Sequence, residues 1–185
     1  FSLILSGCSG GKKDPAAFSP GKVQVLVPQA DGTETIGGEP LILDISHTDQ
    51  GYFVGTVTDT ACRINLQVIG PDGVTYKYFI DETNKPTVFP LTAGNGSYAI
   101  LAFQNITADQ YASLFSQVIN VELQNEFMPF LYPNQYVNFS EDNEAVKLAQ
   151  SLTEDVESDL EALSAIYKYV TENITYDNEK AATVS

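Results

Sequence analysis

Apolar and polar residues alternate along much of the chain between residues 22 and 125, and short turn sequences interrupt the alternation at strand-like intervals. The pattern predicts strands over the segments 22–27, 41–45, 51–57, 62–69, 74–80, 87–89, 97–103 and 111–123. The run 71–73 (Pro-Asp-Gly) predicts a tight turn, because Asp supplies a side-chain acceptor and Gly a positive φ. The segment 97–103 is apolar on both faces, which predicts a central strand.

No helical period interrupts these strands, apart from one short turn expected at 107–110. Strands without intervening helices pair antiparallel, so the region 22–125 predicts an antiparallel β-sandwich. The run 96–100, followed by 115–123, resembles the end of bacterial Ig-like modules. This resemblance implies an Ig-like sandwich that acts as a spacer or as a scaffold presenting a ligand site.

The spacing of apolar residues along the chain changes after residue 125. Residues 126–139 are rich in aromatics and proline, which predicts a packed connector that joins the sandwich to a helical segment. An exposed aromatic platform for a ligand is the functional alternative. Residues 140–185 have helical spacing, with Ser140 expected to cap a first helix. Ser158 and Glu161 form a capping box that opens a second helix, which ends at Asn173. The predicted fold class is therefore α+β.

The first residues have a pattern of their own. An apolar run ends in Leu5-Ser6-Gly7-Cys8, and this ending resembles a bacterial lipobox. The resemblance implies that residues 1–8 are the tail of a signal peptide and that the Cys8 sulfur carries a diacylglycerol, whose chains anchor the protein in a membrane. Residues 9–21 are polar and rich in Gly and Pro, which predicts a flexible tether. A buried strand with a core cysteine is the alternative for the apolar run.

The net charge of −15 narrows the choice of partners. Nine basic residues against 24 acidic ones argue against nucleic acid, because phosphate contacts need Lys and Arg. The same charge disfavours adsorption to anionic headgroups, so contact with a membrane is expected only through the lipid on Cys8. We expect an exported protein at the outer face of a bacterial membrane.

Few residues suggest chemistry in the strand region. Cys62 shares the apolar face of its strand, which predicts a small core residue rather than a nucleophile. The lone histidine, His47, has no nucleophile beside it in the sequence; a metal site with Asp44 or Asp49 is the weaker alternative to a polar loop. No segment matches a calcium loop. We expect no metal and no cofactor.

The second predicted helix carries the most specific pattern. We name its apolar side the 160–170 stripe, formed by Leu160, Leu163, Ile166, Tyr167 and Val170. The runs 165–170, 173–177 and 179–182 resemble the start of transglutaminase-like domains, a family of papain-type cysteine enzymes, in exported proteins of Gram-positive bacteria. The upstream run 127–137 resembles the connector that those proteins carry between a β module and the enzyme domain. The resemblance covers roughly residues 40–185 in architecture and is most specific over 127–182.

This resemblance implies a Cys-His-Asp triad that forms an acyl-enzyme at a glutamine carboxamide or a peptide carbonyl. In the family the nucleophilic cysteine follows on the next major helix. We therefore expect this chain to be the N-terminal portion of a longer surface protein acting on extracellular or cell-wall protein, with no catalytic residue of its own in 1–185. The 160–170 stripe should then be partly exposed or lie on the sandwich. A non-catalytic binding or spacer module, and a structural stalk with a helical cap, are the alternatives.

Overall fold

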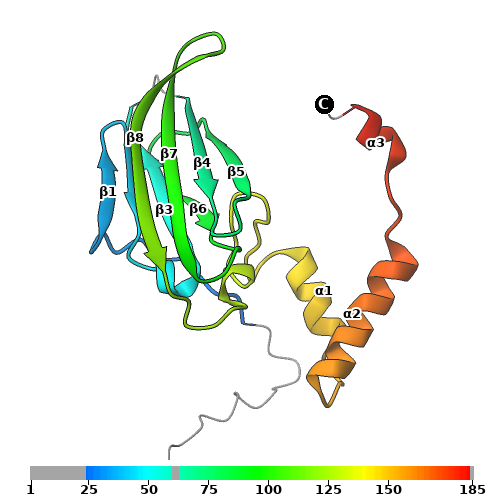
Figure 1. Cartoon of the computed structure of the whole chain (residues 1–185). Helices are drawn as coiled ribbons and strands as arrows, with labels where there is room; N and C mark the ends of the chain where they lie inside the picture. The colour runs from blue at the N-terminus through cyan, green and yellow to red at the C-terminus, as the bar shows by residue number, and fades with distance from the viewer. Residues whose placement is uncertain (1–23, 60–62, 184–185) are drawn as a thin grey trace, which may run out of the picture. The chain divides into compact units, whose positions relative to one another are not determined.

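The computed structural model describes residues 24–59 and 63–183 (Figure 1). These residues form two compact units, one over 25–141 and one that includes 142–183. The first unit contains strands and the second contains helices, so the predicted α+β class is confirmed. The predictions for residues 1–8, the tether 9–21 and Cys62 concern positions outside the described residues.

Two antiparallel sheets of four strands each make up the first unit. Sheet A has the order β1-β2-β3-β6, with β1 (Thr35–Gly38), β2 (Leu41–Asp44), β3 (Tyr52–Val57) and β6 (Thr87–Pro90). Sheet B has the order β5-β4-β7-β8, with β4 (Ile64–Ile69), β5 (Thr75–Ile80), β7 (Gly96–Thr107) and β8 (Gln110–Val121). All ladders between these strands are antiparallel, as the sequence predicts.

One hydrophobic core lies between the two sheets. It combines Leu43, Phe53 and Phe89 of sheet A with Leu66 and Ile100 of sheet B, all of them inaccessible to solvent. Alternation produces this arrangement, because every second residue of a strand points to the same face. In β4, for example, Leu66 and its inward neighbours are buried while the residues between them are partly exposed.

The strand β7 is central in sheet B, between β4 and β8, as its two apolar faces predict. Tyr98 lies near its start and is 1% exposed. The Tyr98 hydroxyl donates to the carbonyl oxygens of Gly94 at 2.8 Å and Leu91 at 3.2 Å. Burial raises the pKa of Tyr98 to about 12. This side chain therefore ties the turn before β7 to the strand itself.

The turns agree with their sequence signals. Gly73 has a φ of 77°, and the Val74 amide donates to the Asp72 carboxylate at 3.0 Å, as predicted for the turn 71–73. The short turn expected at 107–110 joins β7 to β8, with Ala108 at a φ of 47°.

The strand predicted at 22–27 is wrong over its described part. Residues 24–34 form no strand, and β1 lies downstream instead. Pro28 interrupts the segment, and side chains hold it: the Gln29 amide donates to the Tyr52 hydroxyl at 2.9 Å and the Gly32 amide to the Asp44 carboxylate at 2.6 Å. The alternation of apolar and polar residues alone does not distinguish an extended segment held by side-chain hydrogen bonds from a strand that pairs with a neighbour in a sheet.

The connector packs on the outer face of sheet A. Its short 3-10 helix η2 (Met128–Phe130) precedes Tyr132, which is 7% exposed and packs on Tyr52 and Val54. The Tyr52 and Tyr132 ring centroids are 4.6 Å apart. The predicted packed connector is therefore present. Its aromatics pack unevenly, because Phe127, Phe130 and Tyr136 are each more than 60% exposed.

The helical unit comprises α1 (Glu144–Leu152), α2 (Asp159–Asn173) and α3 (Asn178–Thr183). Asn143 caps α1 by accepting from the Ala145 amide at 2.9 Å, so the prediction of Ser140 as the cap is wrong. Asn143 precedes the first helical residue directly, and its amide oxygen satisfies a free N–H there.

The helix α2 ends at Asn173 as predicted. Ser158 accepts from the Glu161 amide at 3.3 Å, which is half of the predicted capping box. The other half differs, because the Glu161 carboxylate accepts from the Glu157 amide at 2.8 Å instead of the Ser158 amide. The carboxylate thus satisfies a donor one residue further from the helix.

Candidate functional site

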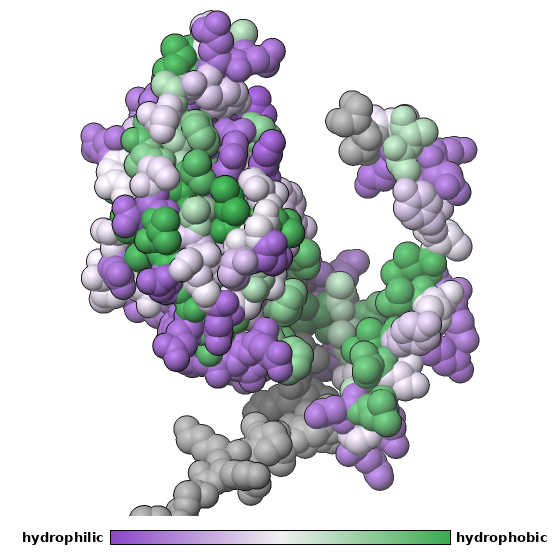
Figure 2. Space-filling model, viewed as in Figure 1, coloured by the Kyte–Doolittle hydropathy of each residue, from purple (hydrophilic) through white to green (hydrophobic). Residues whose placement is uncertain are grey.

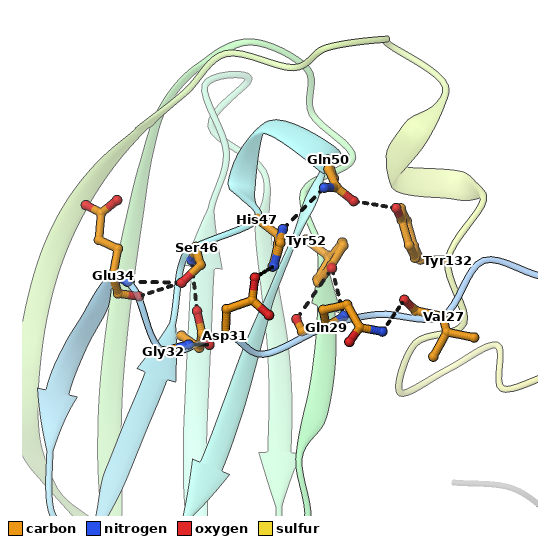
Figure 3. A network of polar contacts seen from close by, with 11 residues as sticks. Val27, Gln29, Asp31, Gly32, Glu34, Ser46, His47, Gln50, Tyr52 and Tyr132 are labelled. Carbon is orange, nitrogen blue, oxygen red and sulfur yellow. Dashed lines mark hydrogen bonds and ion pairs between the residues drawn. The ribbon is translucent and has the colours of Figure 1, made fainter.

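A polar network surrounds the only histidine at one end of sheet A (Figure 3). His47 precedes the 3-10 helix η1 (Thr48–Gln50), and its Nε2 lies 2.9 Å from the Asp31 carboxylate. Gln50 Nε2 is 3.2 Å from His47 Nδ1, and the Tyr132 hydroxyl donates to Gln50 Oε1. The His47 ring also stacks on Tyr52 at 5.7 Å. Both ring nitrogens therefore have partners.

Asp44 anchors the second half of this network. Its carboxylate accepts from the Gly32 amide at 2.6 Å and from the Ser46 amide at 2.9 Å. Burial alone would raise the pKa of Asp44, but the hydrogen bonds from Ser46 and Gly32, with His47 nearby, outweigh it and lower the pKa below its ordinary value. The ionised carboxylate thus holds the segment before β1 against sheet A.

The network does not contain a catalytic dyad within the described residues. The Ser46 hydroxyl accepts from the Glu34 amide at 3.0 Å, so it is engaged in backbone contacts and His47 does not activate it. The metal alternative also fails here, because Asp44 binds backbone amides and Asp49 accepts from the Gln124 side chain. No cluster of three or more His, Cys, Asp or Glu side chains in the described residues is placed to hold a metal ion. The network is best explained as structural.

A second candidate is a groove between β5, β6 and the connector, which we name the aromatic groove. It has a volume of about 280 Å³ and is lined mainly by Tyr76, Tyr78, Phe130, Tyr132, Tyr136 and Phe139. The Tyr136 ring packs on Tyr78 at 5.4 Å, and its hydroxyl donates to the Lys77 carbonyl at 2.9 Å. Burial, with Tyr136 and Tyr76 nearby, raises the pKa of Tyr78 to about 12.

The chain holds the exposed rings of this groove in place. The Asn134 carboxamide oxygen accepts from the Tyr136 amide at 3.0 Å and the Val137 amide at 3.2 Å, which forms a turn under Tyr136. Tyr136 is 67% exposed and Phe130 is 63% exposed. The groove therefore presents exposed aromatic side chains to solvent, with Tyr136 held in place, as the alternative for 126–139 describes.

A wider cleft of about 520 Å³ adjoins the same connector. Gln135 bridges its walls, because its amide donates to the Val88 carbonyl of β6 at 3.2 Å and its side chain to the Phe79 carbonyl of β5 at 2.7 Å. Lys85 in this cleft is paired with Glu82 at 2.8 Å. The cleft mixes apolar and polar side chains, and its charged residues Lys85 and Glu82 pair with each other while Asp81 pairs with Arg63, so no charged group is left to select a ligand.

The 160–170 stripe is exposed within the helical unit. Leu160 is 74% exposed, Leu163 64% and Tyr167 69%, and no residue of α2 is buried. Figure 2 shows hydrophobic side chains along the surface of this helix. An amphipathic helix normally buries such a stripe, so this surface is suited to contact with further protein.

Comparisons with protein-family models, curated proteins and solved structures found no match for this chain. Among the described residues, no helix combines the length and the hydropathy needed to cross a membrane. Of the candidate residues from the sequence, Cys8 and Cys62 lie outside the described residues, and His47 pairs with Asp31 rather than with Asp44 or Asp49. The sequence prediction missed Asp31 and Gln50 as partners of His47. Asp31 lies 16 residues from His47 along the chain, and no motif marks Gln50, three residues from His47, as a partner of its ring.

Proposed function

We propose that this chain is the N-terminal part of a lipid-anchored bacterial surface protein whose further domain is a transglutaminase-like cysteine enzyme acting on extracellular or cell-wall protein. The observation that carries the proposal is the exposed 160–170 stripe on α2, the helix that contains the run 165–170 on which the family resemblance rests. In this proposal α2 is the first helix of the enzyme domain, and the stripe packs against the rest of that domain.

The sandwich supports the first half of the proposal, as an Ig-like spacer. The chain crosses between the sheets from β3 to β4, from β5 to β6 and from β6 to β7, which matches the Greek-key connections of Ig-like sandwiches. The Tyr98 contacts with Leu91 and Gly94 match the tyrosine corner of that fold. Such a module would hold the enzyme away from the membrane that the lipid on Cys8 enters.

The proposed chemistry is acyl transfer. A thiolate attacks the carbonyl carbon of a glutamine carboxamide or a peptide, and the leaving ammonia or amine takes a proton from the catalytic histidine. The resulting thioester is resolved by an amine or by water, which regenerates the thiol. The cysteine that performs this step is expected after Ser185, and no residue of 1–185 is assigned to it.

The test uses the complete protein encoded by the natural gene. Incorporation of a fluorescent primary amine into a glutamine-containing protein, and hydrolysis of the same protein, would be measured together. The proposal requires one of the two activities, which should be lost when a cysteine after residue 185 is replaced and kept with Cys62→Ser. Loss of activity with Cys62→Ser alone, in a folded protein, or the absence of both activities, would overturn the enzyme assignment.

The anchor has a separate test. Cells expressing the protein would be fed an alkyne-tagged fatty acid, and the label would be followed by gel. Cys8→Ser should remove the label and move the protein from the membrane fraction to the soluble fraction. A label that persists in Cys8→Ser would place the lipid elsewhere.

A non-catalytic binding module is the second candidate, and the aromatic groove is the observation that favours it. Exposed, fixed aromatic faces are typical of surfaces that bind ligands. Because the chain has no Trp and four of its ten Tyr line the groove, tyrosine fluorescence responds to a ligand bound there. Tyr136→Ala should abolish binding of an oligosaccharide or a peptide that quenches this signal, while Tyr167→Ala, in the helical unit, should not.

A further inference from the structure

The outer edge of sheet B has an unusual composition. The strand β8 contains 12 residues, Gln110–Val121, and none of them is charged, Pro or Gly. Natural edge strands are normally short, charged, interrupted by Pro or covered, because their free N–H and C=O groups pair readily with another strand. The chain also carries 24 acidic residues, so a surface strand of this length without charge is unexpected.

The other edges are protected. The connector covers β5 through the bonds of Tyr136 to Lys77 and of Gln135 to Phe79, and it covers β6 through the bond of Gln135 to Val88. The strand β1 is only four residues long and ends in two glycines. Among the described residues, no hydrogen bond joins the outer edge of β8 to another element.

The part of β8 best prepared for pairing is the run 115–121. It pairs with 96–102 of β7 without a break, whereas a bulge interrupts the ladder just before Phe115. Ile119 is 7% exposed and Val121 4%, so buried side chains hold the register of this run. Val118 faces the opposite side and is 59% exposed. Every second residue of such a strand directs its N–H and C=O away from β7.

We infer that the β8 edge pairs antiparallel with the β8 edge of a second copy of this chain, which joins two copies of sheet B into one continuous sheet. A second copy carries the same uncharged strand, so a twofold pairing of β8 is self-complementary. Two copies with a net charge of −15 repel over most orientations, and β8 is an edge at which they meet without bringing like charges together. The adjoining edge β1, whose Gly37 approaches the Phe115 ring, is also free of charge. A twofold axis through this side would therefore bring uncharged strands together.

The test measures the mass of the full chain by sedimentation as a function of concentration. Cys8→Ser and a reducing buffer exclude acylation and disulfide linkage. The chain should form a dimer that Val118→Lys weakens at least tenfold, because two lysines would then meet at the paired edge. Val118→Thr should leave the dimer intact. Val74→Lys, at a 46% exposed valine outside β8, is the matched control and should also leave it intact.

Amide hydrogen exchange distinguishes a dimer formed through β8 from one formed through the helical unit. On dimerisation the amides of 115–121 that point away from β7 should exchange more slowly, and Leu163→Glu in the 160–170 stripe should not change that protection. A chain that is monomeric at every concentration, a dimer that Val118→Lys does not weaken, or protection confined to α2 would overturn the inference.

Discussion

The hydroxyl of Tyr98 serves the fold rather than a ligand. It donates to two backbone carbonyls, and Tyr98 as a whole is 1% exposed. We expect Tyr98→Phe to lower the free energy of unfolding by roughly 1–2 kcal/mol, because the buried carbonyls lose a donor and water does not replace it. Urea unfolding would measure the loss. Tyr76→Phe is the control and should cost almost nothing, since no hydrogen bond of the Tyr76 hydroxyl is found among the described residues.

Alkaline pH should reveal two buried phenols. The pKa values of Tyr78 and Tyr98 are raised to about 12 by burial, whereas an unfolded tyrosine titrates near 10. The stability is therefore complete below pH 10 and falls as the pH rises to 12, by roughly 2 kcal/mol per residue. Urea midpoints between pH 9 and 12, with phenolate absorbance, test this. All ten tyrosines titrating together near pH 10 in the folded protein would contradict it.

Acid pH should act through Asp44. Its pKa is lowered in the folded state, so its contribution to stability is present above pH 4 and is lost as the pH falls through the lowered pKa. Asp44→Asn places an amide donor near the Gly32 and Ser46 amides and should cost about 1–3 kcal/mol at pH 7. The variant should also lose less stability between pH 4 and 2. Asp109→Asn, at an exposed turn, is the control, and an equal acid dependence in both variants would refute the role of Asp44.

At the scale of elements, Gly51 fixes the connector on sheet A. Gly51 has a φ of 84°, and a Cβ at that position would collide with the Pro129 ring. Gly51→Ala should therefore destabilise the sandwich and release residues 127–132, which thermal unfolding and limited proteolysis would detect. Gly73→Ala is the matched control, because its φ of 77° imposes the same strain while no atom lies within 4 Å of the added Cβ. Equal losses would mean that strain alone accounts for Gly51.

The strands also show which sequence patterns were sufficient to predict the fold. Alternation located most strands, because inward residues such as Leu66 and Ile100 must be buried. It failed at 22–27, where the residues that hold the segment lie on β2 and β3. The candidate sites failed for the same reason. His47 finds Asp31, and Tyr132 finds Gln50 82 residues away, only after the sheets have formed. The aromatic groove was anticipated only in part, as the alternative for 126–139, because Tyr76 and Tyr78 come from β5.

At the scale of the whole molecule, the two units differ in what stabilises them. The sandwich has a shared core, whereas none of the helices α1, α2 and α3 contains a buried residue. Short helices without buried contacts are marginal in water, since most helical stability in proteins comes from packing. The stability of the described helices thus depends on further packing against their exposed faces.

This difference predicts that unfolding of the chain is not two-state. Helical circular dichroism at 222 nm should decline at lower urea concentrations than the near-ultraviolet signal of the core tyrosines, and α2 amides should exchange much faster than those of β4 and β7. Coincident transitions would contradict it. Because the proposed enzyme domain buries the 160–170 stripe, the longer protein should raise the helical transition and leave that of the sandwich unchanged. A helical transition that stays low in the longer protein would mean that α2 packs on something other than that domain.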